Sequence, residues 1–131
     1  MDYKILFVGD ESLFDYFENL VKRNFGDSYY VETSGNYKEA LEILEQRAEI
    51  SLVVSDIQIP PNSPPVFQSD MSFLDECKLK YPNLMHLVFN SAVLTEEDKL
   101  TLGNMGISYI DNLNNIHAEL KKKIEKLNKA A

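Results

Sequence analysis

Five short apolar segments alternate with five amphipathic segments along this chain, and that alternation limits the fold more than any other feature. The apolar segments have the length of strands and are rich in β-branched and aromatic residues. The segment at 52–55 is apolar almost throughout, as expected for a strand that is buried on both faces of a parallel sheet. The expected strands are residues 4–8, 29–33, 52–55, 86–89 and 107–110.

The amphipathic segments repeat apolar residues at intervals of three and four, which is the spacing of one helix face. Asn36 is expected to cap the second helix, with Glu39 in the capping-box position. Gly26 and Gly106 are expected to end the first and fourth helices, and Pro82 to end the third. Helices of this length between successive strands predict an α/β protein whose doubly wound, five-stranded parallel sheet carries helices on both faces.

Length and charge narrow the class of protein. The 131 residues suffice for one domain that buries roughly two-thirds of its unfolded surface. The net charge of −8 argues against direct binding to nucleic acid, which requires a basic face. No apolar run approaches the length of roughly 18 residues that suggests a membrane span. Since the lone Cys77 cannot form an intrachain disulfide, we expect a protein of the reducing cytoplasm. Cys77 follows Leu74 and Phe73 by three and four residues, so we expect it to be a small core residue.

Acidic residues follow two of the expected strands. Asp56 comes directly after residues 52–55, and Asp10 and Glu11 follow residues 4–8. Because open α/β folds bind ligands at the carboxyl ends of their strands, we expect Asp10 and Asp56 to share a pocket. One strand-end aspartate could equally be a turn or helix-cap residue, but two on one sheet favour a site. Glu11 could also be a first-turn acid that the helix dipole stabilises.

These acids suit Mg²⁺, which prefers hard oxygen ligands and usually takes one or two carboxylates, with water or phosphate oxygens completing its shell. The predicted ligands are the carboxylates of Asp10 and Asp56 and the backbone carbonyl of Gln58. A cation there would offset the repulsion between carboxylate and phosphoryl oxygens. Asp56 could therefore also act as a nucleophile toward a phosphoryl group.

The chain resembles the receiver domains of response regulators. The resemblance rests first on two segments: residues 4–11, Lys-Ile-Leu-Phe-Val-Gly-Asp-Glu, look like the opening motif, and residues 52–60, Leu-Val-Val-Ser-Asp-Ile-Gln-Ile-Pro, look like the phosphoacceptor motif. It continues, in order and at the matching elements, through residues 73–74, 81–82, 87–92 and 106–110. The resemblance implies one receiver domain over residues 1–131 with the flavodoxin-like (βα)5 fold, either standing alone or as the input domain of a longer protein.

The resemblance also implies roles for individual residues. Asp56 would accept the phosphoryl group and Asp10 would bind the metal, while Ser91 would contact the transferred group and Tyr109 would be the aromatic switch residue. From the residues alone, Ser91 reads as a strand-end polar residue and Tyr109 as a half-buried aromatic one. The implied partners are a histidine kinase or phosphotransfer protein and an unidentified effector. The domain would be a signalling module, not an enzyme beyond its own phosphorylation and dephosphorylation.

Three positions and one segment depart from the receiver pattern. Gly9 stands where the family usually has the first of two adjacent acids. Asn112 replaces the lysine at the end of the last strand, next to Asp111, and Leu113 replaces the proline that follows that lysine. The proline-rich segment 60–70 is longer than usual, and it is either a preformed surface that restricts partners or a tolerated insertion.

These departures leave two readings of the function open: a receiver that is phosphorylated on Asp56, or a degenerate receiver that signals by binding alone. Two other classes fit less well. A flavodoxin-like cofactor carrier would need a hydroxyl- and glycine-rich loop where residues 9–12 present acid. Phosphatases with an aspartate nucleophile resemble each other in a second aspartate two residues after the nucleophile. This chain has Gln58 at that position.

Overall fold

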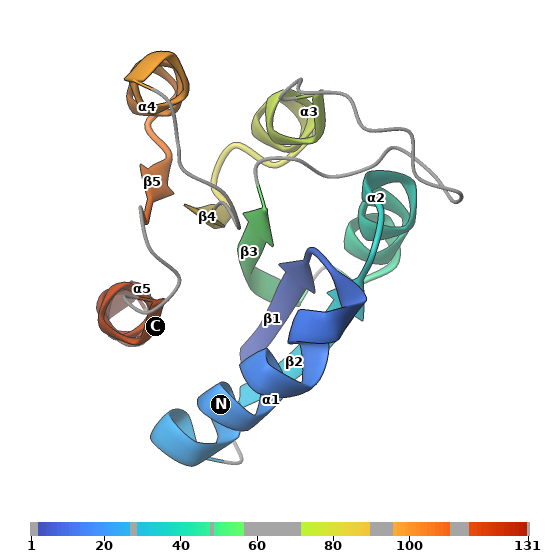
Figure 1. The fold of residues 1–131 in the computed structure, drawn as a ribbon, viewed down its shortest axis with the longest axis vertical. Coiled ribbons are helices and arrows are strands. Elements are labelled where there is room, and N and C mark those ends of the chain that lie inside the picture. Colours follow the sequence, from blue (N-terminus) through green and yellow to red (C-terminus); the bar gives the residue numbers. More distant parts are fainter. Residues whose placement is uncertain are drawn as a thin grey trace.

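The computed structural model describes residues 3–26, 29–47, 49–56, 72–89, 96–110 and 116–130. Its centre is a sheet of five strands in the order β2-β1-β3-β4-β5 (Figure 1). The strands are β1 (Tyr3–Val8), β2 (Tyr29–Ser34), β3 (Ile50–Asp56), β4 (Met85–Phe89) and β5 (Ser108–Tyr109). All four neighbouring pairs are parallel. The predicted doubly wound α/β architecture is therefore confirmed.

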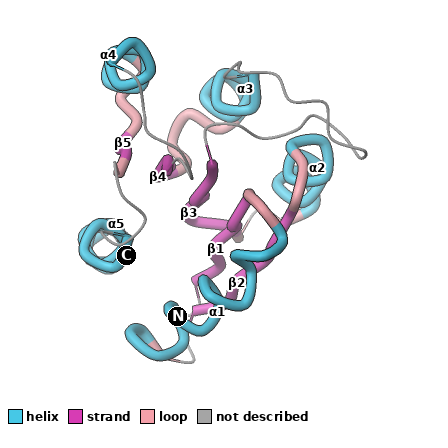
Figure 2. The backbone as a smooth tube through the Cα atoms, viewed as in Figure 1, coloured by secondary structure: helices cyan, strands magenta, loops and turns pink. Residues whose placement is uncertain are grey.

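Helices cover both faces of the sheet (Figure 2). They are the short 3₁₀ helix η1 (Glu11–Leu13), α1 (Phe14–Phe25), α2 (Tyr37–Gln46), α3 (Ser72–Lys80), α4 (Glu96–Asn104) and α5 (Ile116–Ala130). The packing of α1 and α5 against one face, and of α2, α3 and α4 against the other, follows from two separate core clusters. In the part of the chain that the structure describes, no helix combines the length and apolarity needed to cross a membrane.

Side chains on each strand alternate between the two core clusters. On β1, Ile5 and Phe7 point to the α1–α5 side, whereas Leu6 and Val8 point to the side of α2, α3 and α4. All four are at most 1% exposed, because helices cover both faces. This explains why the inner strands are apolar at successive positions. Cys77 of α3 is buried in the core on the side of α2, α3 and α4, as predicted.

The helix ends largely follow the sequence signals. Gly26 and Gly106 have φ values of 83° and 71°, a conformation that glycine adopts at little cost. The Asn36 side chain accepts a hydrogen bond of 2.9 Å from the Glu39 amide at the start of α2. The Asn36 amide, however, donates to the Ser34 hydroxyl at 3.4 Å, so strand β2 supplies the second half of the cap.

One expectation about local structure needs correction. Strand β5 pairs only over Ser108–Tyr109, shorter than the predicted 107–110, although Ile107 and Ile110 are both buried beside it. In α4, Leu102 is fully buried but Leu100 is 67% exposed. The helix is only weakly amphipathic.

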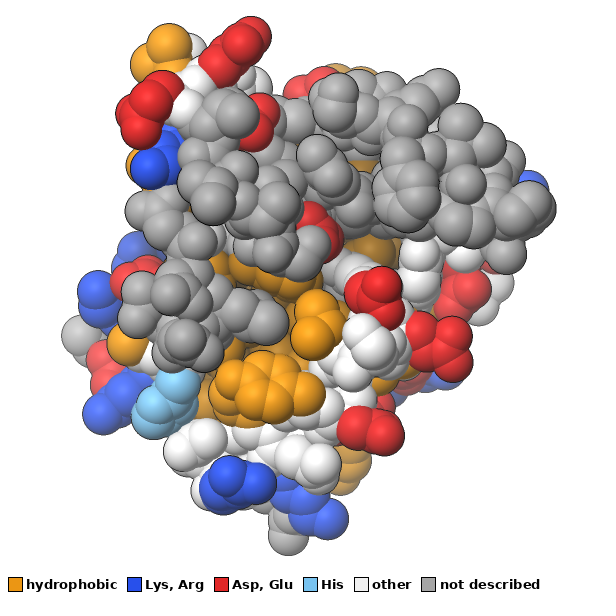
Figure 3. Space-filling view, viewed as in Figure 1, with side chains coloured by type: hydrophobic (Ala, Val, Ile, Leu, Met, Phe, Trp, Pro, Cys, Tyr) orange, Lys and Arg blue, Asp and Glu red, His pale blue; other side chains and the backbone are white. Residues whose placement is uncertain are grey.

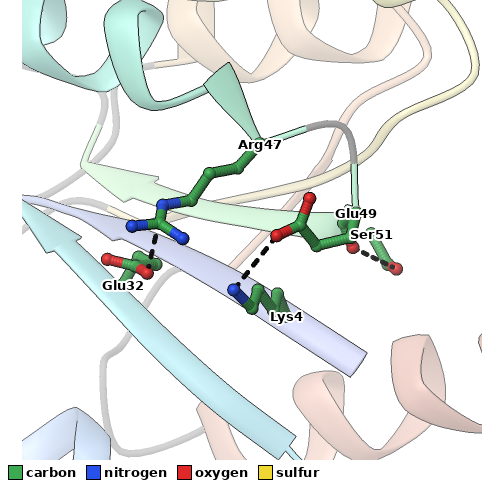
Figure 4. Close-up of polar contacts among 5 residues, drawn as sticks. All are labelled: Lys4, Glu32, Arg47, Glu49 and Ser51. Carbon is green, nitrogen blue, oxygen red and sulfur yellow. Dashed lines mark hydrogen bonds and ion pairs between the residues drawn. The ribbon is translucent and has the colours of Figure 1, made fainter. Parts of the chain in front are cut away.

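Two ion pairs connect the turn between α2 and β3 to neighbouring strands (Figure 4). Lys4 Nζ of β1 lies 3.0 Å from Glu49 Oε1, just before β3, and Arg47 Nε lies 3.3 Å from Glu32 Oε1 of β2. Because these side chains are partly exposed, each pair contributes at most about 1 kcal/mol. They connect the α2–β3 turn to the two strands beside it.

Candidate acceptor site at the carboxyl edge of the sheet

The sheet brings Asp10 and Asp56 to the same edge. Strands β1 and β3 are adjacent and parallel, and their register places Val8 beside Ser55. Asp56 is the last residue of β3, and Asp10 follows β1 by two residues. The two acids thus lie at the same edge of the sheet, while the pocket that they are predicted to share stays a prediction. The other two predicted participants, Gln58 and Ser91, lie outside the described residues.

Asp10 is exposed and forms the cap of η1. Its carboxylate accepts a hydrogen bond of 2.8 Å from the Ser12 amide. Hydrogen bonds from the backbone and then the side chain of Ser12 hold the pKa of this carboxyl below its ordinary value. Asp10 is therefore negatively charged at neutral pH, as a cation ligand must be, although it also fills the helix-cap role that a strand-end aspartate can have.

Asp56 is only 5% exposed, in contrast to Asp10. It continues a strand whose preceding residues, from Leu52 to Ser55, are completely buried. Its neighbour across the pair β3–β4 is Phe89, the last residue of β4. The candidate phosphoacceptor thus lies at the rim of the core, with an aromatic residue level with it on the next strand.

An aromatic stack lies beneath this edge. The rings of Phe7 and Phe89 are nearly parallel, with centroids 5.5 Å apart, and Phe7 stacks on Phe17 of α1 at 4.5 Å. Phe89 also closes over Gly9, where a β-carbon would lie 3.2 Å from its Cζ atom. The sequence drew attention to Gly9 only as a missing acid. It carried no signal that Phe89, two strands away, occupies the space above that glycine.

The space-filling view shows apolar side chains at the surface between α1 and α5 (Figure 3). Phe14 at the start of α1 is partly buried and meets the Phe7 ring edge-on, with centroids 6.1 Å apart. The aromatic stack of Phe7, Phe17 and Phe89 therefore also contacts the first residue of α1, which follows η1.

Tyr109 lies on β5, level with Val88 of β4. It is half-buried and packs against the core on the side of α2, α3 and α4. This matches the half-buried aromatic residue expected from the sequence. Its role as a switch residue stays a prediction.

Lys123 of α5 contacts the same strand, because its amino group donates a hydrogen bond to the Ser108 hydroxyl. Burial, and then the nearby Lys126, lower the pKa of Lys123. Ser108 pairs with Leu87, two residues before the carboxyl end of β4, so this hydrogen bond forms below the acceptor edge. The register therefore does not support Lys123 as a substitute for the lysine that the receiver pattern has at position 112. Asn112 itself lies outside the described residues.

The carboxylates at this edge are chemically suited to a magnesium ion that keeps most of its water. Mg²⁺ usually takes one or two carboxylates, and Asp10 and Asp56 supply that number. Within the described ranges, no cluster of three or more histidine, cysteine or acidic residues could hold a metal by itself. Asp10, Asp56 and the predicted Gln58 carbonyl would therefore hold a cation loosely, with solvent in the remaining positions.

Comparison with known proteins identifies the fold. No protein-family model and no curated protein matches the chain. The signal receiver domain of an HD domain-containing protein from Pseudomonas fluorescens Pf-5 superposes with a TM-score of 0.75, over 98% of this chain and 99% of that one. The chain has the receiver fold of response regulators.

Two further receiver structures superpose on this chain nearly as well. The response regulator receiver domain protein from Clostridium thermocellum matches with a TM-score of 0.74 at 19% identity, over 98% of this chain and 99% of that one. A chemotaxis response regulator of Vibrio cholerae matches with a TM-score of 0.72 at 18% identity, over 94% and 99%. The Pseudomonas domain is 17% identical. At these identities the match establishes the receiver fold, while the metal and phosphorylation sites stay predictions.

Proposed function

We propose that this chain is a receiver domain of two-component signalling that accepts a phosphoryl group on Asp56 from a histidine kinase or phosphotransfer protein. The observation that carries the proposal is the position of Asp56 at the end of the central strand β3 of a receiver fold, with Asp10 after the adjacent strand β1. As a signalling module the domain turns over no separate substrate. The cytoplasmic location expected from the lone Cys77 stays a prediction.

The proposed reaction is a single transfer. A carboxylate oxygen of Asp56 attacks the phosphorus of a phosphohistidine, the phosphorus–nitrogen bond breaks, and the imidazole leaves with its electron pair and takes up a proton. Mg²⁺ would supply charge neutralisation for the carboxylate and phosphoryl oxygens. Asp10 helps to hold the cation with a carboxylate that is already ionised. The burial of Asp56 limits its exposure to bulk water.

The proposed output is a change at the face formed by α4, β5 and α5. Ser91 would contact the new phosphoryl group, and Tyr109 would change its packing between β5 and α4. The effector is proposed only as a protein or domain that docks on this face.

A second candidate is a degenerate receiver that binds partners without phosphorylation. It is favoured by Gly9, which leaves the acidic edge one carboxylate short, and by Asn112, which offers no positive charge to a phosphorylated Asp56. The fold and docking face would be retained in this case. The two candidates differ in one measurable reaction.

Incubation with acetyl phosphate and Mg²⁺, followed by intact mass measurement, tests the proposal. The wild type is expected to gain the mass of one phosphoryl group, and the gain is expected to disappear in Asp56→Asn or when the metal is chelated. Asp15→Asn is the matched control, since Asp15 is an exposed acid in the first turn of α1. Absence of labelling in the wild type, with both acetyl phosphate and a kinase, would favour the degenerate receiver.

A further inference from the structure

Phe89 reaches across a whole strand at the acceptor edge. Strand β3 separates β1 from β4, yet the Phe89 ring of β4 stacks on Phe7 of β1 and closes over Gly9. The ring must therefore pass over β3 on the side of α1 and α5. The register pairs Phe89 with Asp56 and Val8 with Ser55, so Gly9, the residue that follows β1, comes next along that edge, toward Asp56.

Side-chain alternation puts Gly9, Asp56 and Phe89 on one face of the sheet. Phe7, Val54 and Phe89 belong to the core cluster on the α1–α5 side, so Gly9 and Asp56, two residues further along their strands, share that face. On this face, the edge next to Asp56 thus has no side chain at Gly9, and the Phe89 ring fills the space over that glycine. The 5% exposure of Asp56 agrees with this enclosure.

We propose that Phe89 forms an aromatic wall of the acceptor pocket that limits the binding of a hydrated divalent cation beside Asp56. The inference rests on the proposed function, because it concerns the same pocket. Gly9 makes the wall possible, since any side chain there would place its β-carbon 3.2 Å from the ring. The absence of an acid at position 9 and the presence of a large aromatic residue at position 89 are then linked, because the ring occupies the space that a side chain at position 9 would need.

The physical reason lies in the water shell of the cation. Mg²⁺ loses its waters reluctantly and keeps several when only one or two carboxylates bind it. An aromatic ring offers those waters no hydrogen-bond acceptor of ordinary strength, and it fills space that they need. The Phe89 ring cannot swing aside easily, because it is fully buried and held against Phe7, which in turn stacks on Phe17.

The test is a Mg²⁺ titration of the unphosphorylated full chain, followed by calorimetry and by the backbone amide signals of Asp10 and Asp56. Phe89→Leu keeps an apolar side chain but shortens its reach across β3. We expect its apparent Kd for Mg²⁺ to fall by roughly tenfold, the lower end of the range over which residues around metal ligands change affinity. Leu87→Ala is the control, because Leu87 is equally buried on the same strand and face but lies two residues further from the edge.

The outcomes separate this inference from the proposed function. A lower Kd in Phe89→Leu with no change in Leu87→Ala supports the wall, whether or not acetyl phosphate labels Asp56. An unchanged or higher Kd in Phe89→Leu overturns it, even if the wild type is labelled. An equal fall in both variants would mean that general loosening of the core, not the wall, controls the affinity. Absence of saturable binding in every variant also overturns it.

Discussion

The Ser55 hydroxyl oxygen lies 2.7 Å from Nε2 of His86, in a hydrogen bond buried between strands β3 and β4. Ser55 is completely buried and His86 is 7% exposed. The Phe73 ring of α3 meets the imidazole edge-on, with centroids 5.9 Å apart. Ser55 directly precedes Asp56, so this bond ties the strand that carries the candidate acceptor to its neighbour.

Ser55→Ala is expected to lower the free energy of unfolding by about 1–3 kcal/mol, because it leaves a buried histidine nitrogen without its partner. Urea unfolding measures the loss. Ser51→Ala on the same strand is the control, since Ser51 is half-buried and its hydroxyl makes only a 3.4 Å contact with the Glu49 carbonyl. Equal losses for the two variants would show that the Ser55–His86 bond has no special weight.

The stability of the fold is expected to decrease as the pH falls below about 6.5. Burial, followed by the charge of Lys78, lowers the pKa of His86 from 6.5 to about 3. Between these values the unfolded chain binds a proton at this residue and the folded chain does not, so acid favours unfolding by up to roughly 1.4 kcal/mol per pH unit. Well above pH 6.5 the histidine is neutral in both states and contributes no pH dependence.

Urea unfolding across pH 4.5 to 7.5 checks this expectation, since the pH dependence due to His86 should be absent in His86→Leu. The exposed His117 provides the control variant His117→Gln, which should keep the wild-type pH dependence. A His86→Leu protein with the same slope as the wild type would assign the acid sensitivity to the carboxylates instead.

Gly9→Ala is expected to destabilise the protein by about 1–3 kcal/mol, the usual cost of overpacking a filled core. The new β-carbon would approach the Phe89 ring to 3.2 Å, and the ring is held by Phe7. The penalty should shrink in a Phe89→Leu background. Gly103→Ala on α4 is the matched control, because among the described residues no atom outside its chain neighbours and its own helix backbone lies within 4 Å of its β-carbon position, and alanine favours a helix. A Gly9→Ala penalty that is unaffected by Phe89→Leu would refute the steric coupling.

The Cys77 thiol is expected to react slowly with an aromatic disulfide reagent at pH 8 in the folded protein. Burial raises the pKa of this thiol to about 12, so the reactive thiolate is scarce. Leu79→Cys adds a thiol at a position that is 83% exposed on the same helix. That variant should show one fast and one slow thiol, with both fast in urea. Fast reaction of Cys77 in the native wild type would contradict the packing of α3.

Asn112→Lys is expected to enlarge the response of Tyr109 and α4 to a beryllofluoride mimic of phosphorylation. Asn112 lies outside the described residues, so this expectation comes from the sequence. A lysine would add a charge-assisted contact to the phosphorylated pocket, typically about twice as strong as a neutral hydrogen bond. NMR shift changes of equal size in the wild type and the variant would exclude this position as the missing coupling element.

The sequence predicted what depends on periodicity and on strand ends. The apolar runs of β1 and β3 specified buried parallel strands, and the position of Asp56 after such a run specified its sheet edge. Contacts between distant strands were beyond this reasoning. Ser55 meets His86 and Phe89 meets Gly9 because of the strand order and register, which depend on the packing of the whole chain. Periodicity also overstated β5, where few residues form pairs.

Chemical mapping of the phosphoryl group tests the central claim most directly. Borohydride reduces an aspartyl phosphate to homoserine, so treatment of the acetyl phosphate-labelled protein, followed by peptide mass analysis, marks the residue that carried the group. The account predicts homoserine at position 56, formed only when Mg²⁺ is present. Homoserine at another acid such as Asp10, or none at any position after treatment with both acetyl phosphate and a kinase, would contradict it.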